Sequence, residues 1–228
     1  MYGKTRKNVL IRPVFLLLLI FTFCIASAYG QMTADQLRAY LERVRVETGA
    51  PGISVAIAQH GKMILSVGVG YAELENLTPA TGSTVHNIAS ISKTHAAVAV
   101  MQLVEQGKVN LDERIQKYVP YFPEKRWPIT VRHILTHTSG IRHYKRGEFG
   151  EQRIKEKMHY DKFEDAIGIW KDDPLLFKPG EFWSYSSHAS NLMHGIIETV
   201  TGMGFEEYMK KYVWEPAGML STEFDVPD

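Results

Sequence analysis

Residues 96–104 constrain the fold most, because they are apolar at almost every position. An α-helix that is apolar on nearly all sides is normally buried inside a protein. Gly107 is a typical C-terminal cap for it. We therefore expect a buried helix over residues 90–106. The chain has 228 residues, of which 45% are hydrophobic, and this is enough for a single sizeable core around such a helix.

The remaining pattern predicts an α/β (α+β) protein with helices packed on an antiparallel sheet. Thr33 and Gln36 have the spacing of a capping box, and the apolar periodicity that follows predicts a helix ending at Gly49. Apolar residues alternate with small or polar ones on both sides of His60-Gly61, which predicts a β-hairpin. Its strands are expected at residues 53–58 and 63–71. Further helices are expected at residues 130–136, 191–200 and 205–213.

Residues 1–30 have the order of a secretory signal peptide. Basic residues without an acid come first, an apolar run over residues 14–28 follows, and small residues up to Gly30 provide cleavage sites. The run of about 15 residues is shorter than the roughly 20 that span a bilayer. We therefore expect a secreted mature chain of residues 31–228 that does not span a membrane. A transmembrane helix and a mitochondrial presequence are the weaker alternatives.

Charge and cysteine content exclude several classes of function. Loss of the leader would remove four of the 26 basic residues and none of the 25 acidic ones, so the mature chain is slightly acidic. A nucleic-acid partner is therefore not expected, because binding to phosphates requires a basic surface. The single cysteine, Cys24, lies in the leader. The mature chain therefore has no disulfide, Cys-bound zinc or Cys nucleophile.

The motif Ser90-Ile91-Ser92-Lys93 has the Ser-x-x-Lys pattern. Residues three apart lie on the same face of a helix, which brings the lysine amine within reach of the serine hydroxyl. Burial disfavours the ammonium form of a lysine, and a neutral amine can accept the serine proton. The start of the helix also offers backbone N–H groups to an oxyanion. Four residues alone are weak evidence, but this motif begins the most apolar helix of the chain.

Three other features have competing interpretations. His133 and His137 have the i, i+4 spacing of a two-histidine metal face, but no third ligand is evident, so hydrogen bonding between loops is the favoured role of His137. Residues 142–157 are rich in basic side chains and predict either an anion-binding patch or, preferably, a solvated loop. Asn76 begins a glycosylation sequon. Pro79 after that sequon lowers its expected occupancy, and an unmodified turn is the alternative.

Five segments resemble the serine β-lactamase and penicillin-binding-protein superfamily, and they follow the order and spacing of its class C-like branch. The first lies around Gly70-Tyr71-Ala72 and the second around Ser90 to Lys93. The others are Leu135 to Ile141, Pro179 to Ser186 and Glu215 to Met219. The stretch from His137 to Tyr144 is especially similar to the animal serine β-lactamase-like branch. The resemblance covers essentially residues 34–225.

The resemblance implies a role for each matching residue. Ser90 would be the acylated nucleophile, Lys93 its activating partner and Tyr185 a second general acid/base. The family usually has Asn two residues after this tyrosine, where this chain has Ser187. We expect Ser187 to be the substrate-binding residue at that position and peptide or ester bonds, rather than β-lactam antibiotics, to be the substrates. No cofactor is implied.

The third active-site element of the family, Lys-Thr-Gly or His-x-Gly on a strand, does not follow Tyr185 in this chain. We therefore expect the C-terminal strands of the fold to be missing. The chain would then be a fragment, an isoform, a truncated gene model or a degenerate relative. A non-catalytic binding or scaffold protein is accordingly the alternative function. Bare strand edges of this kind also favour self-association.

Overall fold

The computed structural model describes residues 33–145, 148, 160 and 162–225. The predicted signal peptide, residues 1–30 with Cys24, lies outside these residues, as does most of the basic segment 142–157. The chain divides into two compact units, with the boundary between Thr84 and Val85. Each unit has its own hydrophobic cluster, whereas composition predicts a single core.

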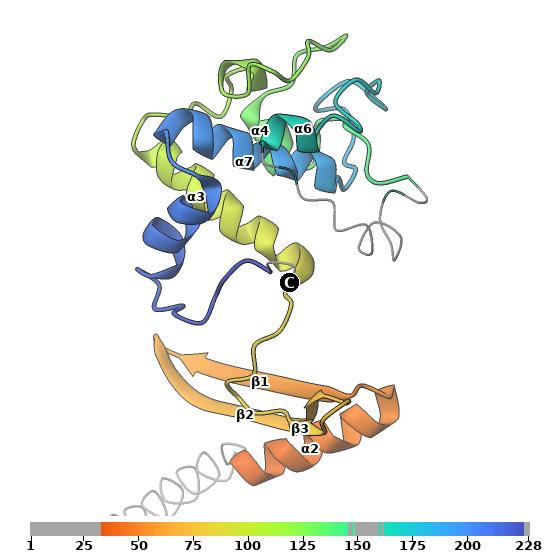
Figure 1. Cartoon of the computed structure of the whole chain (residues 1–228), viewed down its shortest axis with the longest axis vertical. Coiled ribbons are helices and arrows are strands. Elements are labelled where there is room, and N and C mark those ends of the chain that lie inside the picture. Colours follow the sequence, from red (N-terminus) through yellow and green to blue (C-terminus); the bar gives the residue numbers. More distant parts are fainter. Residues whose placement is uncertain (1–32, 146–147, 149–159, 161, 226–228) are drawn as a thin grey trace, which may run out of the picture. The chain divides into compact units, whose positions relative to one another are not determined.

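Over residues 33–84, the described part of the first unit, one helix accompanies a three-stranded antiparallel sheet of order β1-β2-β3 (Figure 1). Helix α2 begins after Thr33, whose side chain and that of Gln36 form the predicted capping box. The helix ends at Gly49, which has a left-handed backbone as expected of a C-terminal glycine. Its apolar face packs against the sheet, and the buried residues of this hydrophobic cluster are Leu37, Leu41 and Val67. The bounds are α2 Ala34–Thr48, β1 Gly52–Gln59, β2 Lys62–Glu73 and β3 Thr78–Pro79.

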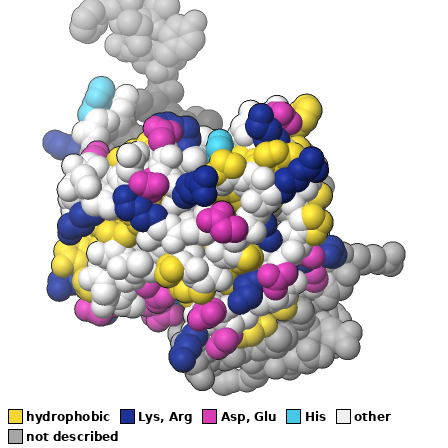
Figure 2. All heavy atoms as spheres, turned by 90° about the horizontal axis from the view of Figure 1, so that it is seen from above, with side chains coloured by type: hydrophobic (Ala, Val, Ile, Leu, Met, Phe, Trp, Pro, Cys, Tyr) yellow, Lys and Arg dark blue, Asp and Glu magenta, His cyan; other side chains and the backbone are white. Residues whose placement is uncertain are grey.

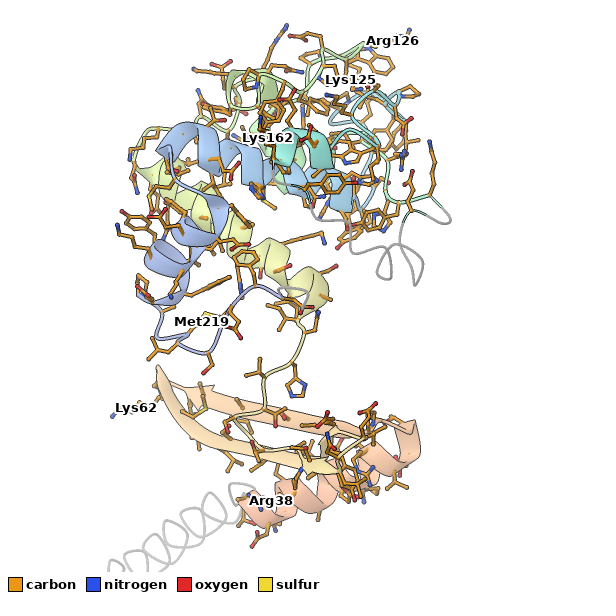
Figure 3. The ribbon with its side chains drawn as sticks, viewed as in Figure 1. Arg38, Lys62, Lys125, Arg126, Lys162 and Met219 are labelled. Carbon is orange, nitrogen blue, oxygen red and sulfur yellow. The ribbon has the colours of Figure 1, made fainter. Side chains whose placement is uncertain are left out.

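The predicted hairpin is confirmed. His60 and Gly61 both have positive φ, 50° and 72°, which is the backbone of a type I′ turn. Lys62 projects from the end of the hairpin beside this turn (Figure 3). The short strand β3 is not predicted from the sequence. Its Thr78 belongs to the sequon of Asn76, which lies in the exposed turn before it.

The second unit is helical and contains the larger core. Helices α3 and α7 pack against each other in it (Figure 1), and α3 also packs against η3. Trp214 of η3 donates its indole N–H to His95 of α3 over 3.2 Å. The bounds are α3 Ser92–Glu105, α4 Val131–Leu135, α6 Phe163–Ala166, α7 Ser187–Thr201, α8 Phe205–Tyr208 and η3 Met209–Trp214, with 3₁₀ turns η1 Ala89–Ile91 and η2 Ile115–Lys117. The segment η3 is a single π-helical stretch.

Helix α3 differs from its prediction in two ways. It begins as a 3₁₀ turn, so Ser90 lies in η1 rather than in the first turn of the α-helix. It is also not buried on all sides. Ala99, Val100 and Leu103 are 0% exposed, but Val98 and Met101 on the same helix are 51% and 39% exposed. Only one face of this helix therefore lies in the core, although apolar side chains occur on both faces.

The surface is mixed in character. On the face shown in Figure 2, acidic and basic side chains are interspersed with hydrophobic ones. Among the residues that the structure describes, no helix is both long and apolar enough to cross a membrane.

Candidate active site

Ser90 and Lys93 meet at the start of α3. The Lys93 Nζ atom donates a hydrogen bond to Ser90 Oγ over 3.1 Å. Because a 3₁₀ turn has three residues per turn, residues i and i+3 lie directly above each other. The change from η1 to α3 thus places the lysine amine over the serine hydroxyl, as the Ser-x-x-Lys motif predicts.

The turn before Ser90 has a strained backbone. Ala89 has a φ of 44°, which an L-residue with a side chain rarely adopts. Its N–H donates to Asn87 Oδ1 over 2.9 Å, and Asn87 Nδ2 in turn donates to Asp225 over 3.2 Å. Strained residues of this kind concentrate at functional sites, where the surrounding structure holds them.

The two serines of the motif have different environments. Ser92 Oγ donates to the backbone oxygen of Ala89 over 2.6 Å, so its hydroxyl stabilises the turn. Ser90 is exposed, and its hydroxyl is the one that interacts with Lys93. The geometry therefore distinguishes Ser90 from Ser92.

Tyr185 lies at the same place. Lys93 Nζ is 5.4 Å from the centroid of the Tyr185 ring. Burial raises the pKa of the Tyr185 phenol, but hydrogen bonding with the Ser90, Lys93 and Ser187 side chains and the charge of Lys93 outweigh it. The net effect is a Tyr185 pKa below its ordinary value. The structure thus brings together all three residues that the resemblance identifies.

Ser187, the predicted substrate-binding residue, is 4% exposed. It is the first residue of α7, and its side chain hydrogen bonds with Tyr185. A role in substrate binding stays a prediction. The contact that the structure supplies is with the phenol.

Two histidines hold the backbone on either side of Tyr185. His137 accepts the Ser186 N–H at Nδ1 over 3.3 Å and the Ser184 N–H at its backbone oxygen over 2.9 Å. His143 accepts the Ser187 N–H at Nδ1 over 3.2 Å. The role of His137 in fixing loops is therefore confirmed, whereas His143 is not identified from the sequence.

Gly140 allows the loop between these histidines to pack closely. Its φ is 74°, and a Cβ atom there would lie 2.4 Å from the backbone oxygen of Phe177. Its own backbone oxygen accepts the N–H of Leu176 over 2.8 Å. A side chain at this position would push apart the loop that carries Gly140 and the loop that carries Phe177.

Arg142, which directly precedes His143, is the centre of an ion cluster with Glu148 and Asp173. The Arg142 side chain is 9% exposed. It donates to both oxygens of Glu148 over 2.6 and 2.8 Å, and its Nε donates to Asp173. A buried guanidinium needs such partners, because an unpaired charge is costly to bury. The sequence predicts a solvated loop or an anion patch here, and for Arg142 both interpretations are wrong.

His188 lies against this cluster with 1% of its surface exposed. Its ring stacks on Trp170 at 4.9 Å, and its Nε2 is 3.2 Å from Arg142. Burial is the main reason that the pKa of His188 falls to about 4, although the Glu148 carboxylate opposes this shift. His188 is therefore neutral at physiological pH and adds no second positive charge beside Arg142.

Glu148→Gln is expected to weaken the dependence of stability on acid pH. Hydrogen bonding from Arg142 is the main cause that lowers the pKa of Glu148 from 4.5 to about 2, against the opposing effect of burial. A carboxyl with a lowered pKa in the folded state stabilises it above the unfolded pKa, and this stabilisation is lost as the pH falls through the folded pKa. Between pH 4.5 and 2 the variant should therefore lose less unfolding free energy than the wild type.

Urea unfolding at pH 7 and at several values below 4.5 measures this difference. Glu105→Gln, at an exposed position of α3, is the matched control and should leave the pH dependence unchanged. Equal pH dependence in wild type and Glu148→Gln would contradict the pairing of Glu148 with Arg142.

The histidine pair does not share a helical face. His133 lies within α4 and accepts the N–H of Thr130 at Nδ1, whereas His137 follows the helix with a φ of 57°. Within residues 33–145, 148, 160 and 162–225, no three His, Cys, Asp or Glu side chains are grouped as a metal site requires.

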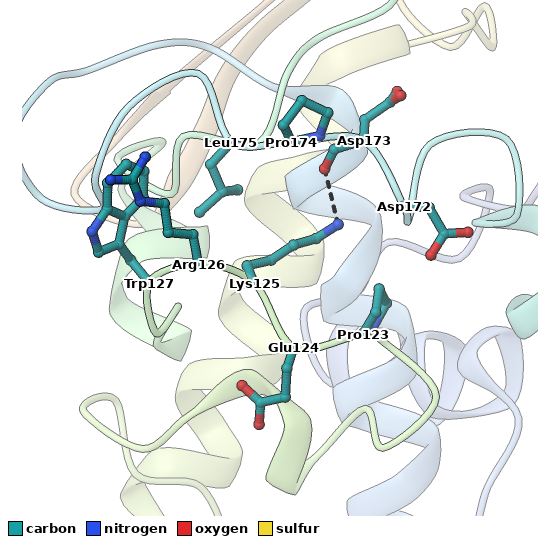
Figure 4. Close-up of a pocket in the computed structure, with 9 residues that line it drawn as sticks. All are labelled: Pro123, Glu124, Lys125, Arg126, Trp127, Asp172, Asp173, Pro174 and Leu175. Carbon is teal, nitrogen blue, oxygen red and sulfur yellow. Dashed lines mark hydrogen bonds between the residues drawn. The ribbon is translucent and has the colours of Figure 1, made fainter.

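At least two cavities lie in the described part of the second unit. One, of about 910 Å³, lies beside Lys93 and is bordered by aromatic side chains that include Phe163, Phe205 and Trp214. The other, of about 360 Å³, is shown in Figure 4. There Lys125 reaches across and donates to the backbone oxygens of Lys171 and Asp173, the latter over 2.9 Å. This lysine thus links its own loop to the loop that carries Asp173.

Several known proteins are similar to this chain. The bovine (Bos taurus) serine beta-lactamase-like protein LACTB, mitochondrial, is 32% identical, over 82% of this chain and 46% of its own length. The octameric penicillin-binding protein homologue from Pyrococcus abyssi is 34% identical with a TM-score of 0.71, over 82% of this chain and 44% of that one. A beta-lactamase/D-alanine carboxypeptidase from Pseudomonas syringae is 27% identical with a TM-score of 0.69, over 85% and 52%.

The chain thus spans about half the length of these relatives, with 46% of the bovine protein covered. The predicted fold class is confirmed, since the chain has the β-lactamase/transpeptidase-like fold of helices with an antiparallel sheet. The beta-lactamase family model matches residues 33–228. The chain therefore belongs to the beta-lactamase family, within the penicillin-binding-protein and β-lactamase superfamily.

Proposed function

We propose that Ser90 is the nucleophile of a serine hydrolase that cleaves peptide or ester bonds through an acyl-enzyme. The observation that carries this proposal is the 3.1 Å hydrogen bond between Lys93 Nζ and Ser90 Oγ, beside a Tyr185 phenol of lowered pKa. Nucleophile and base within hydrogen-bond reach are what covalent catalysis requires. Membership of the beta-lactamase family supports the same chemistry.

The reaction has two steps, the acylation of Ser90 and the hydrolysis of the acyl-enzyme. Ser90 Oγ attacks the substrate carbonyl carbon as Lys93, in its neutral form, accepts the hydroxyl proton. The bond between the carbonyl carbon and the leaving amine or alcohol then breaks, and Tyr185 donates a proton to this leaving group. Water attacks the resulting ester of Ser90, releases the acid and returns the proton to the serine. Lys93 and Tyr185 both lie close enough to Ser90 to pass this proton between them.

The names of two relatives support the substrate class and assembly. The Pseudomonas syringae relative is named as a D-alanine carboxypeptidase, which supports a peptide substrate, and the Pyrococcus abyssi relative is described as octameric, which supports self-association. The basic, apolar and small-residue order of residues 1–30 supports secretion, with those residues forming a signal peptide before a partial β-lactamase-related domain over 31–228. The mitochondrial naming of the bovine relative supports the alternative destination.

A fluorophosphonate probe tests the nucleophile in the 228-residue chain. Such a probe phosphonylates an activated serine with loss of fluoride, and mass spectrometry of the digested protein locates the label. We expect the label on Ser90, because its hydroxyl faces Lys93 while that of Ser92 is bound to Ala89.

Ser92→Ala is the matched control and should keep the label. A label on Ser92 would contradict the assignment of the nucleophile. A folded chain that takes no label would instead support the non-catalytic binding or scaffold function.

A further inference from the structure

We propose that His143 is a positioning residue for the Tyr185 phenol and that the ion cluster of Arg142, Glu148 and Asp173 holds His143 in place. This inference rests on the proposed acid/base role of Tyr185. The sequence motifs assign no role to these residues, although Arg142 and His143 lie in the stretch from His137 to Tyr144 that resembles the family. The inference comes from contacts between segments that are distant in the chain.

His143 acts on Tyr185 in two ways. The edge of its ring meets the Tyr185 ring, with centroids 5.4 Å apart and planes at 72°. Its Nδ1 also accepts the N–H of Ser187, two residues beyond the tyrosine. His137 contacts the tyrosine from the other end of this loop. Its ring is tilted by 40° to the Tyr185 ring with centroids 4.6 Å apart, and its Nδ1 accepts the N–H of Ser186. The phenol ring therefore lies against two imidazoles that also fix the backbone following it.

Only one of these imidazoles is held by burial. His137 is half-buried, but His143 is exposed, so packing alone does not fix its ring. Its position depends on the residue before it. The backbone oxygen of Arg142 accepts the Ser186 hydroxyl over 2.8 Å, and this hydroxyl also accepts the N–H of Ala189 as the N-cap of α7. The Arg142 backbone is thus joined to the start of the helix that follows Tyr185.

The Arg142 side chain is fixed from a third segment. Asp173 accepts its Nε–H, and Lys125 donates to the backbone oxygens of Lys171 and Asp173, of which Figure 4 shows the bond to Asp173. A charge-assisted bond to a buried guanidinium is about twice as strong as a neutral one. The chain of contacts therefore runs from Lys125 through Asp173 and Arg142 to His143.

The position of the phenol matters because its lowered pKa depends on contacts with neighbouring groups. Those groups are Lys93 and Ser90 from the start of α3 and Ser187 from α7. The imidazoles of His137 and His143 lie against the ring that makes these contacts. Hydrogen bonds weaken steeply with distance and angle. A small displacement of the ring should therefore weaken the bonds to Ser90 and Lys93 and raise the pKa of Tyr185 toward its ordinary value.

Two variants of His143 separate its two contacts. His143→Phe keeps an aromatic ring but removes the acceptor of the Ser187 N–H, whereas His143→Asn supplies an amide oxygen close to the position of Nδ1. The absorbance of tyrosinate near 295 nm reports the titration of the phenol. Because the chain has 11 tyrosines, each variant is compared with its own Tyr185→Phe double variant, and the difference belongs to Tyr185.

In the full 228-residue chain we expect His143→Phe to move the Tyr185 titration to higher pH by at least about half a unit, as the loss of part of one hydrogen bond implies. His143→Asn should restore most of the wild-type titration. Asp173→Asn, with His143 intact, should shift the titration in the same direction as His143→Phe. Circular dichroism confirms that each variant is folded.

An unchanged titration in folded His143→Phe would overturn the role of His143. A shift in His143→Phe together with no shift in folded Asp173→Asn would overturn the role of the ion cluster. The phenol titration does not depend on turnover. If Ser90 takes no fluorophosphonate label while the titration shifts as expected, the proposed function fails and the positioning role of His143 stands.

Discussion

Lys93→Met is expected to slow fluorophosphonate labelling of Ser90 by about 10²- to 10⁴-fold, the usual contribution of a general base. The substitution removes the amine that lies 3.1 Å from Ser90 Oγ but keeps an unbranched side chain of similar length. The serine hydroxyl then has no adjacent lysine to accept its proton. The pseudo-first-order rate of labelling, measured by mass spectrometry with excess probe, gives the ratio directly.

Lys108→Met is the matched control, because Lys108 is an exposed residue just beyond the C-terminus of α3. Its labelling rate should equal that of the wild type. An unchanged rate in Lys93→Met would instead contradict the role of Lys93 as the base.

Local geometry explains which part of the site is predictable from the residues. Ser90 and Lys93 are three positions apart, so any helical turn brings them together. Tyr185 has no such local relation to either residue, and only the resemblance to the β-lactamase superfamily identifies it. The Arg142–Asp173 contact joins residues 31 positions apart, and the Ser187–His143 contact joins residues 44 positions apart. Neither sequence periodicity nor a local motif predicts contacts between residues so far apart in the chain.

The same distinction holds for the fold. The capping box at Thr33 and the turn at His60 are local signals, and the structure confirms both. Helix α7 begins at Ser187 rather than at the predicted residue 191, because the Ser186 hydroxyl caps it by accepting the Ala189 N–H. The exposure of Val98, in contrast, depends on which surfaces of other elements meet α3 and cannot be read from an apolar run.

Leu103→Ala is expected to lower the free energy of unfolding by about 2–5 kcal/mol, the usual range for a truncated leucine in a packed core. Leu103 is 0% exposed in α3 and belongs to the large cluster of the second unit. Its backbone oxygen also accepts the N–H groups of Lys108 and Val109 over 2.9 and 3.2 Å, which fix the end of the helix. The surrounding core is therefore held on several sides and cannot easily collapse into the space that the side chain leaves.

Val98→Ala on the same helix is the matched comparison. Because Val98 is 51% exposed, it loses little buried area, and alanine has the higher helix propensity. We therefore expect a change within about 0.5 kcal/mol, which is typical of surface substitutions. Urea unfolding of the 228-residue chain measures both variants in one experiment. If Val98→Ala lowered the free energy of unfolding as much as Leu103→Ala does, the one-sided burial of α3 would be contradicted. That result would instead support a helix buried on all sides, as the apolar run predicts. A large difference between the two would instead establish that the core of this unit is built on the face of α3 that carries Ala99, Val100 and Leu103.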